Sequence, residues 1–274
     1  MKTRNIVWTR LGLPTALAVG LAAAGCAVET ESEAAAPDAS SAPAVSGAVA
    51  DTGAGGEGEG GVSITQAAND PVVYLSALAI TEAHVLAGRD AYAAGFTDAA
   101  GEMFAHPVSE VLADMAPVFE QRGVADFTDV LLDASDAAYN GENLARIDDR
   151  VAAVVAALRQ AAESAPATQM SAGEIAARVA ADQIDRAADM YTVAQGSDAY
   201  EPYLDGYGFY KAALSAFEAD KAAIRAATPD AVPSLEAVLD ALGQAYPAAT
   251  RPDALDAESG RLMALSSRVT LALD

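Results

Sequence analysis

The spacing of apolar residues after residue 70 constrains this chain more than any other feature. Apolar side chains recur there at intervals of three and four residues, which places them on one face of an α-helix. No segment alternates apolar and polar residues for long enough to predict a β-strand. We therefore predict an all-α fold for residues 70–274, an antiparallel bundle of about eight helices. One such apolar stripe consists of Phe104, Val108, Val111, Met115 and Val118.

Proline, glycine and capping residues set the boundaries of the predicted helices. The first opens at Asp70-Pro71 and closes at Gly95, and the second runs from residue 97 to 121. Pro107 and Pro117 are expected to kink or break the second helix, because proline lacks the N–H that a helix interior needs. The size of this region allows two subdomains that meet near residue 168. The remaining helices are expected near 125–139, 142–165, 171–195, 199–228, 231–245 and 253–272.

The N-terminus has the layout of an export signal. A positively charged start is followed by an apolar run, Leu11 to Leu21, that is too short to span a bilayer. Small residues then lead to Cys26, the sole cysteine, which has no partner for a disulfide. We therefore predict that residues 1–25 are a cleaved signal peptide.

The segment Ala22-Ala23-Ala24-Gly25-Cys26 resembles the lipobox of bacterial lipoproteins. The resemblance implies that Cys26 is lipidated and becomes the mature N-terminus, so that the lipid holds the protein at a membrane surface. By the same resemblance, Ala27 in place of aspartate implies the periplasmic face of the outer membrane. The expected location is thus the cell envelope.

Residues 26–69 are expected to be a disordered linker. After Cys26 they consist mainly of alanine, glycine, serine, proline and acidic residues, and contain no aromatic or basic residue. Such a composition cannot bury enough apolar surface to fold. The chain as a whole carries a formal net charge of −23. Nucleic acid is therefore excluded as a partner, whereas cations and cationic proteins are favoured.

The chain contains only two histidines, His84 and His106. They stand at similar distances from the predicted turn at Phe96, roughly 18 Å before it and about 15 Å after it along the helix axes. In an antiparallel helical hairpin the two imidazoles are therefore expected to lie level with each other.

Helical phase decides which neighbouring carboxylates can join the histidines. His106 and Glu110 are four residues apart and share a helix face. Glu82 and His84 are two residues apart and point in opposite directions. We place His84 in the candidate site, because it lies on a face of small residues, and expect Glu82 to pair with Arg89.

A later helix carries two further candidate ligands. Glu201 and Asp205 are four residues apart, and Gly206 and Gly208 would let another backbone approach closely. If this helix packs against the first hairpin, Glu201 or Asp205 can complete a coordination sphere. A separate face of the same helix is expected to be buried, and it consists of Tyr203, Tyr207, Tyr210, Leu214 and Phe217.

Two histidines with carboxylates suit a transition-metal ion such as iron, zinc, manganese or copper. Bundles that bind metals take such ligands from facing helices. The alternative is that both histidines are ordinary core or surface residues. Nothing indicates an enzyme, since the chain has no G-x-S-x-G elbow, no glycine-rich phosphate loop and no H-E-x-x-H motif.

An exported helical protein with a histidine–glutamate pair and a later helix rich in tyrosine and carboxylates is similar in style to imelysin-like proteins and other periplasmic accessories of bacterial iron uptake. That family uses a G-x-H-x-x-E motif, where this chain has Glu82-Ala83-His84 and His106-Pro107-Val108-Ser109-Glu110. The resemblance implies that His84, His106 and Glu110 bind a transition metal for delivery or sensing.

The sequence thus predicts a lipid-anchored periplasmic binding module, with a transition-metal ion such as iron, zinc or copper as its ligand. The alternative is a structural or interaction lipoprotein that docks another envelope protein through its helical surface.

Overall fold

The computed structural model describes residues 61–274. The predicted signal peptide, the predicted lipidation site Cys26 and most of the predicted linker lie outside the described residues. The whole described region belongs to one compact unit of the chain.

Within residues 61–274 the protein forms ten α-helices and one π-helical turn, with no strand. The prediction of an all-α fold is therefore confirmed. The elements are α1 (Ile64–Ala67), α2 (Pro71–Ala93), α3 (Thr97–Pro107), η1 (Val108–Leu112), α4 (Ala113–Arg122), α5 (Thr128–Tyr139), α6 (Leu144–Ala162), α7 (Ala172–Gln195), α8 (Glu201–Ala227), α9 (Val232–Ala245) and α10 (Ser259–Leu273).

Capping residues begin the helices where the sequence indicates. Asp70 accepts a hydrogen bond from the backbone N–H of Val72 at 2.8 Å, and Pro71 occupies the first turn of α2. Ser171 and Glu174 form the expected capping box at the start of α7. Gly95 ends the α2 turn with a φ of 93°, a conformation that favours glycine.

Three features differ from the predictions. The second predicted helix is interrupted after Pro107 by η1, as expected, but Pro117 stays inside α4 without ending it. A one-turn helix, α1, lies within the segment predicted as linker. The last helix begins at Ser259 rather than near residue 253, because Arg251 donates hydrogen bonds to the carbonyls of Ala194 and Ser197 and holds the preceding segment against the end of α7.

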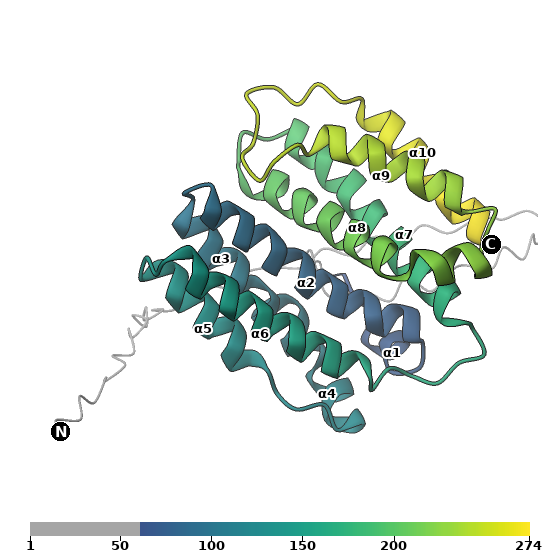
Figure 1. Ribbon diagram of the computed structural model, residues 1–274, viewed down its shortest axis with the longest axis horizontal. Coiled ribbons are helices and arrows are strands. Elements are labelled where there is room, and N and C mark those ends of the chain that lie inside the picture. The colour runs from purple at the N-terminus through teal and green to yellow at the C-terminus, as the bar shows by residue number, and fades with distance from the viewer. Residues whose placement is uncertain (1–60) are drawn as a thin grey trace, which may run out of the picture. The chain divides into compact units, whose positions relative to one another are not determined.

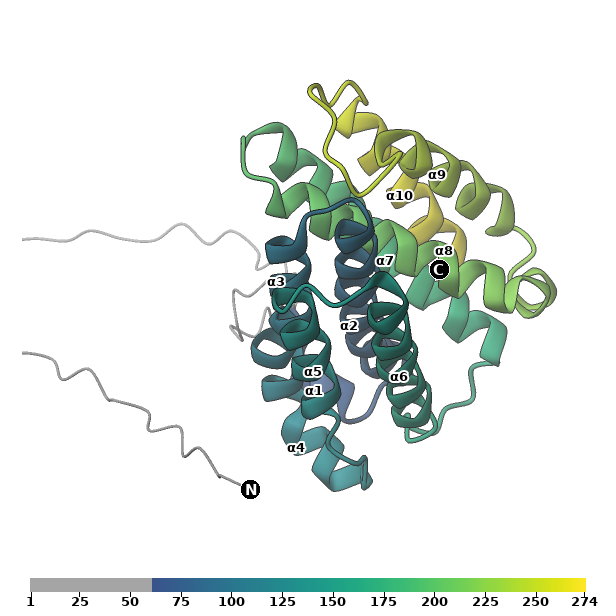
Figure 2. The same cartoon turned by 60° about the vertical axis from the view of Figure 1, so that its left-hand side comes forward.

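The helices form two layers (Figure 1). Helices α2 to α6 make one layer, and α7 to α10 make the other. The chain passes from the first layer to the second through residues 163–171. Helix α2 packs on α3 and α6 within its own layer and on α7 and α8 across the layers (Figure 2). It is therefore the central helix of the bundle.

Small residues allow α2 to approach its neighbours closely. A Cβ atom on Gly208 of α8 would lie 2.5 Å from the carbonyl oxygen of Ala83, a separation that no packing tolerates. A Cβ atom on Gly88 would lie 3.0 Å from the ring of Phe104 in α3. The two glycines thus bring α8 and α3 against the middle of α2, where His84 is located.

The predicted apolar face of α8 is largely buried. Tyr203, Tyr207 and Phe217 are buried, while Tyr210 and Leu214 are half-buried. Tyr203 and Tyr246 donate their hydroxyl protons to the carbonyls of Ala248 and Ala187, both at 2.8 Å. These bonds connect the loop after α9 to α7 and α8.

Helix α2 is, among the described residues, the one helix long and apolar enough to cross a membrane by length and composition. Of its most apolar window, 78% is buried inside the bundle. This burial is typical of the central helix of a helical bundle.

Candidate metal centre

His84 lies in the middle of α2 with its side chain only 1% exposed. Its Nδ1 lies 2.8 Å from the carbonyl oxygen of Ile80, one turn earlier. Because a carbonyl can only accept, Nδ1 carries the proton and donates it to Ile80. The other ring nitrogen, Nε2, therefore presents a lone pair. Metal-ligating histidines commonly have their second nitrogen fixed in this way.

Burial lowers the pKa of His84 to about 4. Desolvation is the largest cause, and the nearby His106 and Arg186 lower the pKa further. The imidazole is therefore neutral near pH 7. A neutral imidazole is the form that binds a metal ion, and no proton has to leave His84 first.

Two carboxylates from other elements face the His84 lone pair. Nε2 lies 3.6 Å from Oε2 of Glu110 and 3.8 Å from Oδ1 of Asp205. It makes no hydrogen bond to any of residues 61–274. Imidazole nitrogen and carboxylate oxygen are both ligands that transition-metal ions accept, so an ion between these atoms would bind all three.

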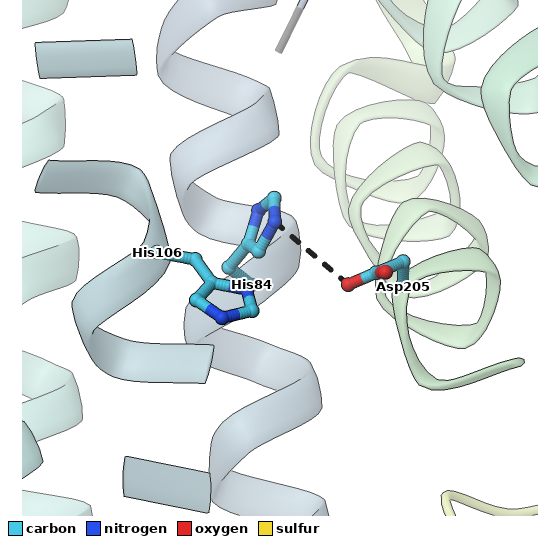
Figure 3. Close-up of side chains that lie close together, drawn as sticks. All are labelled: His84, His106 and Asp205. Atoms are coloured by element: carbon cyan, nitrogen blue, oxygen red, sulfur yellow. Dashed lines mark ion pairs between the residues drawn. The ribbon is translucent and has the colours of Figure 1, made fainter. Parts of the chain in front are cut away.

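His106 completes a group from three helices, α2, α3 and α8. Figure 3 shows His84, His106 and Asp205 pointing toward a common space. The imidazole rings of the two histidines are 6.1 Å apart between centroids and meet edge to face. One ligand atom from each of the three residues lies within 4.8 Å of the other two, so that the group can hold a metal ion.

The distances at His84 nearly match those of a bound ion. Zinc takes nitrogen and oxygen ligands at about 2.0–2.2 Å, so two ligands of a tetrahedral ion are roughly 3.4 Å apart. The Nε2–carboxylate separations are 3.6 and 3.8 Å. Both separations are only slightly longer than the spacing of two ligands on a bound ion, so small shifts of these side chains would close them around it.

Glu110 reaches the group from the π-helical turn η1. Pro107 precedes this turn and lacks the N–H that would continue the regular α-helical bonding. The backbone N–H of Ala113 instead bonds to the carbonyl of Val108, five residues earlier. Single π-turns of this kind frequently occur at functional sites.

Asp205 and Glu201 come from the first two turns of α8. Asp205 has a fully buried side chain, and the close contact of Gly208 with Ala83 brings it over His84. Glu201 is the first residue of α8, with its side chain 55% exposed. Its Oε1 lies 3.7 Å from Nε2 of His106.

The structure brings all five predicted metal ligands into one place. Glu110 and Asp205 surround the Nε2 of His84, and Glu201 faces His106. The predicted lipidation site, Cys26, lies outside the described residues.

Arg186 of α7 was missed at the sequence level. Its guanidinium lies 5.9 Å from the ring centroid of Phe209, which itself packs edge to face on His84. Arg186 stands among Asp182, Asp185 and Asp189, a pattern typical of a solvated helix face. Only the packing of α7 on α8 reveals that it lies near the histidines.

The predicted pair of Glu82 and Arg89 is wrong. Glu82 is buried and accepts a hydrogen bond from Arg159 of α6 at 2.8 Å, while Arg89 pairs with Asp148 and Asp90. Seven residues separate the two along α2, about 10 Å of helix. The neighbouring helix α6 offers closer partners to both.

Comparison of the chain with protein-family models, with curated proteins and with solved structures finds no match. The resemblance to imelysin-like proteins therefore stays a prediction.

Proposed function

We propose that this protein is a lipid-anchored periplasmic binding module whose ligand is a transition-metal ion, held by His84, His106 and Asp205 with Glu110 beside them. The observation that carries the proposal is the buried Nε2 of His84. This nitrogen is neutral, and the bond from Nδ1 to Ile80 fixes its orientation. It faces two carboxylates, and it makes no hydrogen bond of its own within residues 61–274.

The ligand atoms favour a divalent ion. Imidazole nitrogens and carboxylate oxygens suit Zn²⁺, Fe²⁺ and Cu²⁺, whereas Cu⁺ prefers sulfur ligands. The negative charges of Asp205 and Glu110 offset the charge of the ion, and Arg186 nearby reduces the net negative charge of the group. We therefore propose a singly occupied divalent site.

Binding rather than catalysis is the proposed role. His84 and Asp205 are buried, which leaves little room for a substrate beside the ion. Reversible uptake of a metal for delivery or sensing requires only that the ligands close around it. The lipobox-like segment that ends at Cys26 supports a location at the cell envelope.

Calorimetric metal titration tests the proposal. The sample is the chain from residue 26 onward with Cys26→Ser, which prevents acylation, titrated with Zn²⁺, Cu²⁺ and, without oxygen, Fe²⁺. We expect one ion per chain for the unaltered site and loss of this binding in His84→Ala/His106→Ala. Circular dichroism establishes that the double variant is folded. Equal uptake by both proteins would refute the site, and a folded wild-type chain that binds none of the ions would favour the docking lipoprotein instead.

A matched control excludes nonspecific binding to this acidic chain. Glu163 is an exposed carboxylate at the end of α6, so Glu163→Gln removes one negative charge outside the candidate site. We expect Glu163→Gln to retain wild-type affinity, whereas Asp205→Asn lowers it.

A further inference from the structure

The five clustered residues differ widely in exposure. The exposed fraction of the side chain is 55% for Glu201, 25% for Glu110 and 23% for His106, but only 1% for His84 and 0% for Asp205. The cluster is therefore open to solvent at the start of α8 and closed at the middle of α2.

The distances divide the cluster into two positions. The inner position is formed by His84, Asp205 and Glu110, with separations of 3.6 and 3.8 Å from the His84 Nε2. The outer position is formed by His106 and Glu201, whose Nε2 and Oε1 are 3.7 Å apart. The edge-to-face contact of the two imidazoles joins the positions.

On the basis of the proposed function, we infer that Glu201 and His106 form a loading position, where a divalent ion binds first before it passes to the inner position. The buried, hydrogen-bond-free Nε2 of His84 marks the inner end of this route within the described residues. His106 serves both positions, because its ring lies against His84 while its Nε2 faces Glu201.

Two physical reasons require a carboxylate at the outer end. A divalent ion loses its hydration shell at a high cost unless protein ligands replace the waters in steps. In addition, the N-terminus of a helix carries partial positive charge and repels cations. Glu201 is the first residue of α8, so its carboxylate counters that charge at the point where the ion would arrive.

The route predicts that Glu201 controls rates more than affinity. A residue that binds the ion only in passage lowers the barrier for loading and for release alike. In Glu201→Gln, association and dissociation should both slow by about tenfold, the scale of electrostatic steering, with little change in Kd. In Asp205→Asn, by contrast, dissociation should become faster and Kd should rise.

Stopped-flow absorption with Co²⁺ measures both rates, since the visible spectrum of Co²⁺ reports its coordination. Loading is followed after mixing the Cys26→Ser chain with Co²⁺, and release after mixing the loaded chain with EDTA. Glu163→Gln is the matched control, because it removes the same charge from an exposed position. It should load and release at wild-type rates.

The outcomes separate the route from the proposed function. The route is supported if both loading and release become slower in Glu201→Gln while the Glu163→Gln control keeps wild-type rates. Unchanged rates, or a higher Kd that arises only from faster release, would overturn it, since Glu201 would then be a bystander or an ordinary inner ligand. Two ions bound per wild-type chain would also overturn it, because the outer position would be a permanent site. A wild-type chain that binds no Co²⁺, Zn²⁺, Cu²⁺ or Fe²⁺ would remove the proposed function and the route together.

Discussion

Acid should destabilise the metal-free protein through His84. The ordinary pKa of histidine is 6.5, and burial lowers that of His84 to about 4 in the folded state. Between these values the unfolded chain binds a proton that the folded chain does not. The contribution of neutral His84 to the stability of the fold is therefore fully present above pH 6.5, and it is lost as the pH falls toward 4.

The magnitude follows from the size of the shift. Each pKa unit corresponds to about 1.4 kcal/mol, so the contribution of His84 to the free energy of unfolding falls by roughly 3 kcal/mol between pH 7 and pH 4. Carboxylates also titrate in this range, so the contribution of His84 has to be isolated by comparison with a variant that cannot titrate at this position.

Urea unfolding followed by circular dichroism, with EDTA present, measures this contribution. The free energy of unfolding is determined between pH 7 and pH 4 for the Cys26→Ser chain and for the same chain with His84→Leu. We expect the free energy of unfolding of the chain with His84 to fall by roughly 3 kcal/mol more than that of the His84→Leu chain over this interval. Parallel pH profiles for the two proteins would refute the inference that His84 is buried in its neutral form.

Two further predictions concern packing and metal binding. Gly208→Ala should destabilise the protein by about 1–3 kcal/mol and weaken Zn²⁺ binding, because the new Cβ would lie 2.5 Å from the Ala83 carbonyl oxygen. Its control is Gly260→Ala in α10, where a Cβ meets nothing within 4 Å and stability should hold or rise, as thermal unfolding will show. Zn²⁺ at about 100 times its Kd should add about 2.7 kcal/mol to the free energy of unfolding of the wild type and nothing to that of His84→Ala/His106→Ala; equal gains in both would contradict a site at these residues.

Local sequence signals predicted the helices well because they act over a single turn. The Asp70-Pro71 start and the Ser171–Glu174 capping box involve residues at most three positions apart. The start of α10 was misplaced for the opposite reason. Hydrogen bonds from Arg251 to the distant end of α7 fix the segment before it, and no local pattern records them.

The candidate site shows the same division between local and tertiary information. Helical phase alone places His106 and Glu110 on one face and separates His84 from Glu82, and the structure has this arrangement. The sequence could not decide whether Asp205 or Glu201 lies nearer to His84. That choice depends on where α8 crosses α2, which the contact of Gly208 with Ala83 determines.

A purely structural role for His84 makes a different prediction from a metal-binding role. A structural core histidine has both ring nitrogens satisfied, and its replacement typically costs a few kcal/mol. Here Nδ1 bonds to a helical carbonyl, while Nε2 faces carboxylate oxygens at 3.6 and 3.8 Å without a hydrogen bond inside residues 61–274.

Replacement of His84 by leucine, which is close to it in volume, should therefore change the metal-free stability at pH 7 by no more than about 1 kcal/mol, because it removes an unsatisfied buried nitrogen along with one hydrogen bond. The same variant should lose the stabilisation that Zn²⁺ gives the wild type. Chemical denaturation with EDTA and then with Zn²⁺ measures both effects on one pair of proteins. A loss of 3 kcal/mol or so without metal, with the response to Zn²⁺ intact, would show that His84 supports the core and does not bind the ion.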